Sequence, residues 1–442
     1  MSKSDPPANA APGQVPEPLG EVFEVPAGRV VQGQPNPPGS KSITQRFFNL
    51  ALLGRLPLVV RRPLLSEDTR LFLGALQAAG FEVAMEDDDL RLEPVHEPDG
   101  GEIFCGNGGT LFRFLTAALT AVPGTWRLDG VERLRERTVA PLIESLRNLG
   151  ARIDCPEREG FAPLVIHGGT LEGGETTLDA SASSQFLSAL LMAGLAASRP
   201  TTLRVLALTS APYVDLTLDA IGGFGGEVHR HAPDLFHIQP SQLSQGDVVC
   251  EADFSSVAYP AAAAALAGGA IQIPGLKPKS RQGDRGFIDV LQVMGANVHW
   301  GEAGLEVSAG ALRAVELDLS RMPDQVPTLA ALAPFAEGTT RITNVPHLRI
   351  KESDRLAAMA RELSRVGAEV EELADGLVIP GIWHQKAPPK RSVTVETYGD
   401  HRIAMSMALV GLRRPGIRIR DPEVVAKSYP AFWSDFASWI AT

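Results

Sequence analysis

The sequence predicts a two-domain α/β (α+β) protein built from six copies of one unit. At 442 residues the chain is long for a single hydrophobic core, so two domains are expected. Apolar residues make up 44% of the chain and aromatic residues only 6%, which suits helices packed closely on sheets. Two short phrases also recur along the chain, with a period of about 72 residues.

The first phrase marks the end of a helix and the start of a strand. An apolar residue is followed by glycine, a small or apolar residue, any residue, and valine or isoleucine. Glycine ends a helix as a C-cap, and alternating residues after it begin a strand. The phrase occurs five times, 70 to 75 residues apart, at Gly80, Gly150, Gly225, Gly295 and Gly367.

The second phrase is a short polar segment that opens an apolar helix, and we call each copy a helix-start segment. An amphipathic helix, such as residues 352–370, follows in each copy. We therefore predict six units of the βαβ-and-hairpin kind, with one buried helix each and three buried helices per domain. The helix-start segments lie 67 to 76 residues apart and begin at Gly39, Gly106, Asp179, Asp253, Asp324 and Asp400.

These segments are candidate anion sites. Free N–H groups and the positive end of the helix dipole favour anions at a helix start, although Ser, Asp and Gly there are also ordinary caps. The first segment adds Lys41 and Arg46. It is not a nucleotide P-loop, because Ser40 and Pro35 stand where that motif needs glycine.

Other segments carry donors that capping does not require. Residues 132–137, ERLRER, form either an anion site or a solvated charged turn, and the sequence leaves both interpretations open. Lys351 and Arg355 are four residues apart, and on a helix such like charges repel unless an anion lies between them. Further donors are Asn107, Gly109, Arg113, Ser183, Ser184, Gln185, Ser210, Tyr213, His401, Arg402 and Lys427.

Two acids stand among these donors. Asp324 opens a buried helix, and Glu352 adjoins Lys351. An acid at a helix start is usually a cap, but in a basic cleft it would stay ionised and act as a base toward a hydroxyl. The pattern therefore predicts proton transfer and electrostatic stabilisation on a substrate pair rich in phosphate and carboxylate.

Composition excludes several other classes. The net charge of −11 argues against nucleic acid or an anionic membrane surface as the main partner. No apolar run is long enough to span a membrane, and residues 1–21 are expected to form a disordered tail with no signal peptide, so a cytoplasmic protein is expected. The three cysteines match neither a metal nor a disulfide spacing, and no metal is expected.

From about residue 22 to the end, the chain closely resembles the 5-enolpyruvylshikimate-3-phosphate (EPSP) synthase family of enolpyruvyl transferases. The matching phrases are PGSKS…R, GNGGT…R, RER, DASASSQ…SALLMA, SAPYVD, QGD…VLQVMGA, MPD, KESDR, YGDHR and AKSYP. Each phrase alone is weak, but together and in this order they are highly specific.

The resemblance implies a two-lobed inside-out α/β barrel with six βαβαββ units, three per lobe around parallel buried helices. Lobe I would hold residues 22–40 and 253–442, and lobe II residues 41–252, with the active site between them. It further implies transfer of the enolpyruvyl group of phosphoenolpyruvate to the 5-hydroxyl of shikimate 3-phosphate, without a cofactor. We also expect a monomer with no partner beyond these two substrates.

Site residues carry over by the same resemblance. Asp324 resembles the base for the 5-hydroxyl, and Glu352, beside Lys351, the acid for the methylene carbon, with His401 orienting the Glu352 side. Lys41 and the arginines would stabilise the anionic intermediate. Shikimate 3-phosphate contacts would be Lys41, Ser42, Arg46, Ser183, Ser184, Gln185, Ser210, Tyr213, Asp324, His347 and Lys351. Phosphoenolpyruvate contacts would be Lys41, Asn107, Gly109, Arg137, Gln185, Arg355, Arg402 and Lys427.

The chain departs from the family pattern at four positions. His347 stands where the family usually has Asn, and Gly108 where it has Ala or Ser. Phe114 and Thr138 replace the usual prolines after two arginines. None of these changes removes a charged catalytic group.

Two rival readings remain open. A sister enolpyruvyl transferase, acting on UDP-N-acetylglucosamine, uses a loop cysteine as its acid, and Cys105 lies near the corresponding loop. However, Cys105 follows Ile103 and Phe104 at a predicted strand end and is expected to be buried. The second rival is an anion-binding or scaffolding protein without catalysis, against which the presence of Asp324 and Glu352 argues.

Overall fold

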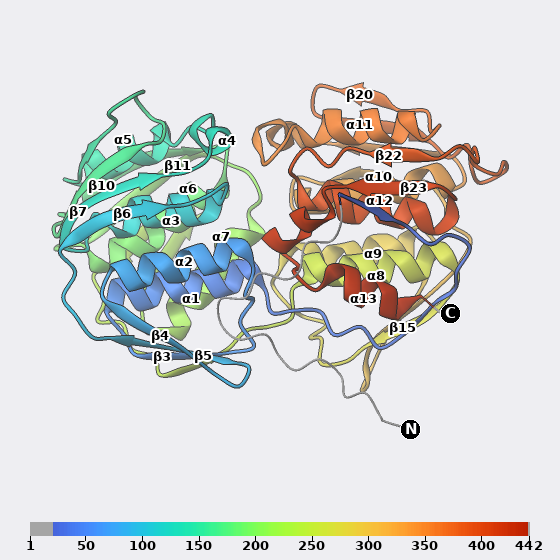
Figure 1. Cartoon of the computed structure of the whole chain (residues 1–442). Coiled ribbons are helices and arrows are strands. Elements are labelled where there is room, and N and C mark those ends of the chain that lie inside the picture. The colour runs from blue at the N-terminus through green and yellow to red at the C-terminus, as the bar shows by residue number, and fades with distance from the viewer. Residues whose placement is uncertain (1–20, 441–442) are drawn as a thin grey trace.

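The computed structural model describes residues 21–440 and shows two lobes side by side (Figure 1). The blue-to-green lobe holds the helices from α1 (Lys41–Gly54) to α7 (Pro212–Gly223). The yellow-to-red lobe holds those from α8 (Phe254–Ala267) to α13 (Phe432–Trp439). The tail predicted over residues 1–21 lies outside the described residues except for its last residue.

Each lobe has its own hydrophobic core. One core takes its buried residues from Phe48 to Val248. The other combines Val25 and Val31 with residues between Ala252 and Trp439. We keep the names lobe I and lobe II for the predicted ranges, whose boundaries at 40/41 and 252/253 stay a prediction.

Six sheets are present, one for each predicted unit. In five of them, one parallel pair of strands is extended by two antiparallel strands. The sixth has one parallel and one antiparallel pair. This mixture of parallel pairs and hairpins confirms the predicted α/β (α+β) class.

The sheets of lobe II contain, in order, β14-β3-β5-β4, β6-β7-β9-β8 and β10-β11-β13-β12. Their strands are β3 (Leu58–Arg61), β4 (Phe81–Glu86), β5 (Asp89–Pro94), β6 (Gly100–Phe104), β7 (Gly124–Asp129), β8 (Arg152–Asp154), β9 (Leu164–Gly168), β10 (Gly174–Ala180), β11 (Thr201–Leu208), β12 (Glu227–Ala232), β13 (Leu235–Gln239) and β14 (Asp247–Val249).

The sheets of lobe I contain β16-β17-β15-β2, β18-β19-β21-β20 and β1-β23-β22. Their strands are β1 (Val22–Glu24), β2 (Val31–Gly33), β15 (Gly269–Ile273), β16 (Asn297–Gly301), β17 (Gly304–Ser308), β18 (Glu316–Asp318), β19 (Thr339–Thr343), β20 (Glu371–Leu373), β21 (Gly376–Pro380), β22 (Val393–Val395) and β23 (Ile417–Arg420).

Each unit contributes one helix to the centre of its lobe. In lobe II these are α1, α3 (Gly109–Ala118) and α6 (Ser184–Ala193), and α3 packs against both of the others. In lobe I they are α8, α10 (Val326–Leu332) and α12 (His401–Arg413), which also contact one another. The prediction of three buried helices per lobe is therefore confirmed.

The second helix of each unit packs farther out, and in every unit except that of α13 it ends at the repeated glycine phrase. Its glycine has a positive φ in all five copies, from +76° at Gly225 to +106° at Gly295. This backbone conformation carries little strain only for glycine, so the phrase marks a C-cap as predicted. These helices are α2 (Glu67–Ala78), α5 (Ala140–Asn148), α7, α9 (Gly286–Val293), α11 (Arg355–Arg365) and α13.

The chain crosses between the lobes at two places that lie side by side. Gly39 forms an antiparallel bridge with Ala252, and the Ser40 amide donates to the Glu251 carbonyl at 2.7 Å. A Cβ at residue 39 would collide with the Arg62 carbonyl, so the close approach requires glycine there. In residues 21–440, none of the helices is long and apolar enough to cross a membrane.

Candidate active site

One pocket lies between the lobes, and all six helix-start segments reach it. Because each segment precedes a central helix, their N-termini face the same space, which favours anions. From lobe II the lining includes Lys41, Ser42, Arg46, Gly109, Thr110, Arg137, Ser183, Ser184, Gln185, Ser210 and Tyr213. From lobe I it includes Asp253, Ser255, Pro323, Asp324, Lys351, Glu352, Arg355, His401 and Arg402. All of the catalytic and substrate-contact residues implied by the family resemblance line this pocket except Asn107, His347 and Lys427.

Two buried arginines of lobe II, Arg46 and Arg113, bond only neutral groups. Arg46 donates to the Ser42 and Tyr213 carbonyls at 2.7 and 2.8 Å and to the Thr217 hydroxyl at 2.8 Å. Burial lowers the pKa of Arg46 to about 10, because no carboxylate offsets the loss of water. This guanidinium therefore lacks a counter-charge that an anionic ligand would supply.

Arg113 behaves in the same way one unit farther on. It donates to the Gln185 side-chain oxygen and lies over the Phe186 ring, 5.1 Å from the centroid. Burial, with Arg137 nearby, lowers the pKa of Arg113 to about 9. Arg113 does not line the pocket, and it fixes Gln185, whose amide also donates to the Thr110 hydroxyl at 2.8 Å.

Glycine at position 109 lets Arg137 approach the start of α3. A Cβ at this position would collide with the Arg137 guanidinium. Arg137 is 5% exposed and lies 4.0 Å from the Glu352 carboxylate across the cleft. Because Gly109 has no side chain, the Arg137 guanidinium lies directly at the N-terminus of α3. The guanidinium and the helix N-terminus both favour an anion at this point.

The arginines of the lobe I wall are different, because they are paired with carboxylates. Arg355 donates to Asp324 and Asp400 at 2.8 Å each and to Glu352 at 2.9 Å. Burial alone would lower the pKa of Arg355, but Asp400, Glu352 and Asp324 raise it above its ordinary value. Arg402 also donates to Asp324, at 2.8 Å.

Asp324 is not a helix cap. It lies in a 3₁₀ turn (Pro323–Gln325) before α10, and its carboxylate accepts no hydrogen bond from the helix start. Asp253 and Asp400, in contrast, do cap their helices through Ser255 N–H and Arg402 N–H, both at 3.0 Å. The Asp324 carboxylate is thus directed into the pocket, where the Tyr213 hydroxyl from lobe II donates to it at 3.3 Å.

The carboxylates of Asp324 and Glu352 are both held ionised. Burial raises the pKa of Asp324, but Arg402 and Arg355 outweigh this effect and keep it below its usual range. The pKa of Glu352 also lies well below its usual value, because Arg355 and Arg137 outweigh burial. An anionic ligand bound to these arginines would partly neutralise their charge and would therefore raise the pKa values of Asp324 and Glu352.

Lys351 is not on the same helix as Arg355, so the i, i+4 repulsion that a shared helix would bring does not apply to this pair. Asp354 caps α11 by accepting from the Ala357 amide at 3.0 Å, and the helix begins only at Arg355. Lys351 instead follows the 3₁₀ helix η5 (Pro346–Ile350) in an extended conformation. Burial lowers the pKa of Lys351 to about 8, with Asp324 opposing this effect.

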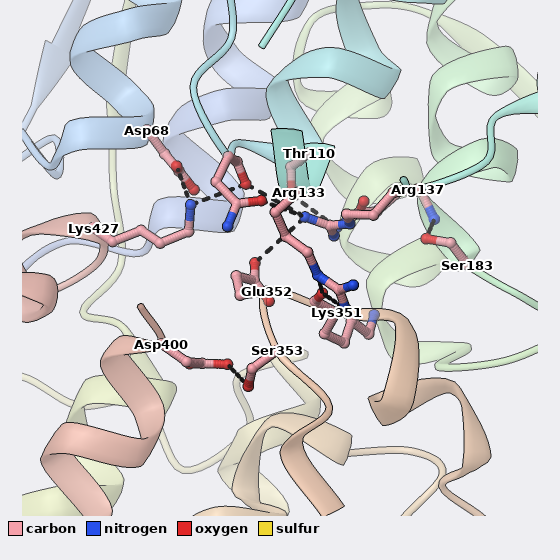
Figure 2. A network of polar contacts seen from close by, with 12 residues as sticks. Asp68, Thr110, Arg133, Arg137, Ser183, Lys351, Glu352, Ser353, Asp400 and Lys427 are labelled. Atoms are coloured by element: carbon pink, nitrogen blue, oxygen red, sulfur yellow. Dashed lines mark hydrogen bonds and ion pairs between the residues drawn. The ribbon is translucent and has the colours of Figure 1, made fainter. Parts of the chain in front are cut away.

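Lys427 reaches across the cleft from lobe I, although it does not line the pocket. Its ammonium donates to the Asp68 carboxylate and to the Asn107 carbonyl, both at 3.0 Å (Figure 2). Lys41 donates to the other Asp68 oxygen at 3.1 Å. Asp68 therefore fixes two of the predicted phosphoenolpyruvate-binding lysines, and Asn107 contributes its main chain.

The two predicted histidines are both buried and near the cleft. His347 lies outside the pocket lining and bonds the Thr209 hydroxyl of lobe II at 3.4 Å through Nδ1, while burial lowers its pKa to about 4. Among the described residues, neither ring nitrogen of His401 has a hydrogen-bond partner. Burial and Arg402 keep the pKa of His401 well below its usual value, so its ring is neutral.

The comparisons with known proteins agree on one family. The sequence model of the EPSP synthases (3-phosphoshikimate 1-carboxyvinyltransferases) matches residues 25–436. A 3-phosphoshikimate 1-carboxyvinyltransferase of Syntrophobacter fumaroxidans is 43% identical over 412 residues, covering 92% of this chain and 96% of its own. The chain belongs to the EPSP synthase family.

Solved structures of the family share the fold. An EPSP synthase from Acinetobacter baumannii has a TM-score of 0.78 at 26% identity, covering 95% of this chain and 98% of its own. The enolpyruvyl transferase NikO from Streptomyces tendae, at 19% identity and a TM-score of 0.73, shows likeness of fold alone. The 3-phosphoshikimate 1-carboxyvinyltransferase of Yersinia ruckeri is 41% identical over 419 residues.

One feature separates this EPSP synthase family member from an enzyme with a cysteine acid. Cys105 is fully buried behind the helix-start segment of α3. Burial, with Asp129 and Asp68 nearby, raises the pKa of the Cys105 thiol far above its ordinary value. A neutral buried thiol of this kind packs as a small apolar group and does not face the pocket.

Proposed function

We propose that this protein transfers the enolpyruvyl group of phosphoenolpyruvate to the 5-hydroxyl of shikimate 3-phosphate and releases phosphate. Beyond family membership, the observation that carries the proposal is the asymmetry of the pocket. In lobe II, Arg46 lines the pocket and bonds only neutral groups, whereas in lobe I the ionised Asp324 and Glu352 line it and are paired with arginines. Such a pocket suits two phosphorylated substrates that meet beside a base and an acid.

In the proposed mechanism, Asp324 acts as the base. Its carboxylate accepts the proton of the 5-hydroxyl while that oxygen attacks C2 of phosphoenolpyruvate. Arg355 and Arg402 hold Asp324 in place, and Tyr213 donates to it across the cleft. Lys351, beside this group, takes part in binding the shikimate 3-phosphate and in stabilising the charge of the attacking oxygen.

Glu352 acts as the acid. Binding of the phosphoenolpyruvate carboxylate and phosphate to Arg137 and Arg355 weakens the support for the Glu352 charge, so Glu352 takes up a proton. It gives that proton to the methylene carbon, and the product is a tetrahedral intermediate that carries the phosphate. The methyl carbon then returns a proton to the Glu352 carboxylate, the C2–O bond breaks with its electron pair leaving on inorganic phosphate, and the carbon–carbon double bond reforms.

The remaining predicted residues bind and orient the substrates. We assign shikimate 3-phosphate to the lobe II donors Ser42, Arg46, Ser183, Ser184, Gln185, Ser210 and Tyr213, with His347 at the lobe I edge. We assign phosphoenolpyruvate to Lys41, Gly109, Arg137, Arg355, Arg402 and Lys427, with Gln185 and the Asn107 loop beside them. The neutral ring of His401 would pack near Glu352 and exclude water.

The test is release of phosphate from phosphoenolpyruvate by the purified protein under three conditions: with shikimate 3-phosphate, with UDP-N-acetylglucosamine and without an acceptor. We expect release with shikimate 3-phosphate alone. Release with the nucleotide sugar would instead support the sister reaction. A folded protein that binds phosphoenolpyruvate but releases no phosphate with any acceptor would support the non-catalytic alternative.

A further inference from the structure

Arg133, in the motif ERLRER, crosses the cleft without lining the pocket. From the short helix α4 (Glu132–Arg135) in lobe II, its guanidinium donates to the Lys351 carbonyl through Nε at 3.2 Å and Nη2 at 3.0 Å. Nη2 also lies 3.4 Å from the Arg349 carbonyl. Figure 2 shows this side chain extending toward Lys351.

The three arginines of the motif have different surroundings. Arg137 lines the pocket, and Arg135 bonds Asp129 within its own lobe. Arg133 alone among the three bonds main-chain carbonyls of lobe I. Its side chain is 34% exposed and that of Arg135 is 39% exposed, so the two differ mainly in whether they reach the other lobe.

The two carbonyls belong to the segment that places Lys351. The 3₁₀ helix η5 ends here, and the chain turns into an extended conformation at Lys351 before α11 begins. A helix end leaves carbonyls without a partner in the helix, and a cation is favourable there. Arg133 satisfies these carbonyls from outside, and Glu136 steadies its guanidinium at 2.6 Å.

The Lys351 side chain, unlike its main-chain carbonyl, is not fixed by a polar contact among the described residues. Within residues 21–440, its ammonium makes neither an ion pair nor a hydrogen bond, although it lines the pocket. The position of that ammonium is therefore set by its main chain, which Arg133 bonds. The contact exists only while the lobes are close enough for Arg133 to span the cleft.

We propose that Arg133 is a positioning residue for Lys351, and that it couples approach of the two lobes to placement of the Lys351 ammonium in the shikimate 3-phosphate site. The proposal rests on the proposed function for the identity of that ligand. Lys427 also crosses the cleft, but it is assigned to substrate binding, whereas Arg133 acts through the main chain of another residue.

The first test compares Arg133→Gln with Arg135→Gln as the matched control. Hydrogen bonds from a charged donor are lost in the first variant, so the KM for shikimate 3-phosphate should rise about 10- to 100-fold, while kcat changes by less than about threefold. Arg135→Gln should stay within about threefold of the unchanged protein in both constants. Arg133→Lys should restore part of the loss, because an ammonium can still donate to one carbonyl.

A second kinetic readout concerns Lys351 itself. The alkaline limb of kcat/KM for shikimate 3-phosphate should shift in Arg133→Gln and not in Arg135→Gln, because a displaced ammonium meets a different set of charges. A merely structural loss of stability would lower activity without moving this limb. Urea unfolding of both variants checks that each is folded.

The third test needs no substrate and so separates this proposal from the proposed function. Small-angle X-ray scattering of the ligand-free proteins should give a larger radius of gyration for Arg133→Gln than for Arg135→Gln, because one link across the cleft is gone. Equal radii, together with equal KM values and equal pH limbs, would overturn the role of Arg133. Absence of turnover in the unchanged protein, with a difference in radius, would overturn the proposed reaction and leave the link standing.

Discussion

Arg46 and Arg355 lie on opposite walls of the pocket and have opposite electrostatic surroundings. Arg46 in lobe II donates to hydroxyls and carbonyls, and burial lowers its pKa to about 10. Arg355 in lobe I meets three carboxylates, which raise its pKa. The difference teaches that a buried arginine can serve as a receptor for an anion or as a support for acids, depending on what surrounds it.

The largest expected effect concerns Asp324, the proposed general base on the lobe I side of the pocket. Asp324→Asn keeps the shape of the side chain and its contacts with Arg355 and Arg402 but removes the group that takes the proton. We expect kcat to fall about 10²- to 10⁴-fold, the range for loss of a general base, while calorimetry shows shikimate 3-phosphate still bound.

Asp318→Asn is the control, because Asp318 lies in the same unit, away from the pocket, and accepts from the Ser320 amide at 2.8 Å. An unchanged kcat in Asp324→Asn would show that another group takes the proton.

The next largest effect contrasts the two buried arginines directly. Arg355→Met leaves the buried Asp400 and the partly buried Asp324 and Glu352 without a shared cation, which should lower the free energy of unfolding by about 3–5 kcal/mol. Arg46→Met leaves only neutral acceptors unsatisfied, which should cost about 1–3 kcal/mol. Urea unfolding at pH 7 measures both values, and equal losses would break the contrast between the walls.

A pH effect of intermediate size belongs to Lys351. Its pKa of about 8 lies below the ordinary 10.5, so the ammonium is present below pH 8 and lost above it. We expect kcat/KM for shikimate 3-phosphate, which reports the free enzyme, to fall about tenfold per pH unit above pH 8. Lys351→Arg stays charged and should lose this limb, so a limb that persists in that variant would belong to another group.

The same shift has a stability consequence with a defined sign. A lysine whose pKa is lower in the folded state costs stability wherever it is charged, that is, below about pH 8. This cost is relieved as the pH rises from about 8 toward 10.5, because the folded protein releases its proton first.

The smallest effect is expected at Cys105. Cys105→Ser replaces a buried thiol that faces away from the pocket, so kcat should stay within about twofold of the unchanged value. Phosphate release measures it. A strong loss of kcat in a variant that unfolds at the same urea concentration would return the cysteine-acid mechanism to consideration.

The central helices and the cleft follow from the sequence because their signals are periodic. Each helix-start segment joins a polar cluster to an apolar helix, and six copies predict six helix N-termini at one place. Roles within a segment are less visible: Asp253, Asp324 and Asp400 look alike in the sequence, yet only Asp324 is free of its helix start. Asp68 also looks like an ordinary helix-start acid, and its two lysine partners come from distant units.

Contacts between lobes leave the weakest trace in the sequence. The reach of Arg133 to the Lys351 carbonyl joins residues 218 apart, and the partner is main chain that carries no residue-specific signal. The bounds of α11 also differ from the prediction. The sequence pattern predicts a helix over residues 352–370, whereas α11 begins at Arg355, after the Asp354 cap, and ends at Arg365.

The paired crossings at Gly39 and Ala252 make lobe II an insertion into lobe I whose two ends are already neighbours. A cut through both crossings would yield separate pieces, each with its own core, and religation would need no spacer in lobe I. Mixing the pieces would then turn an intramolecular encounter into a bimolecular one. The concentration at which activity returns would measure the effective concentration that the two covalent connections between the lobes provide.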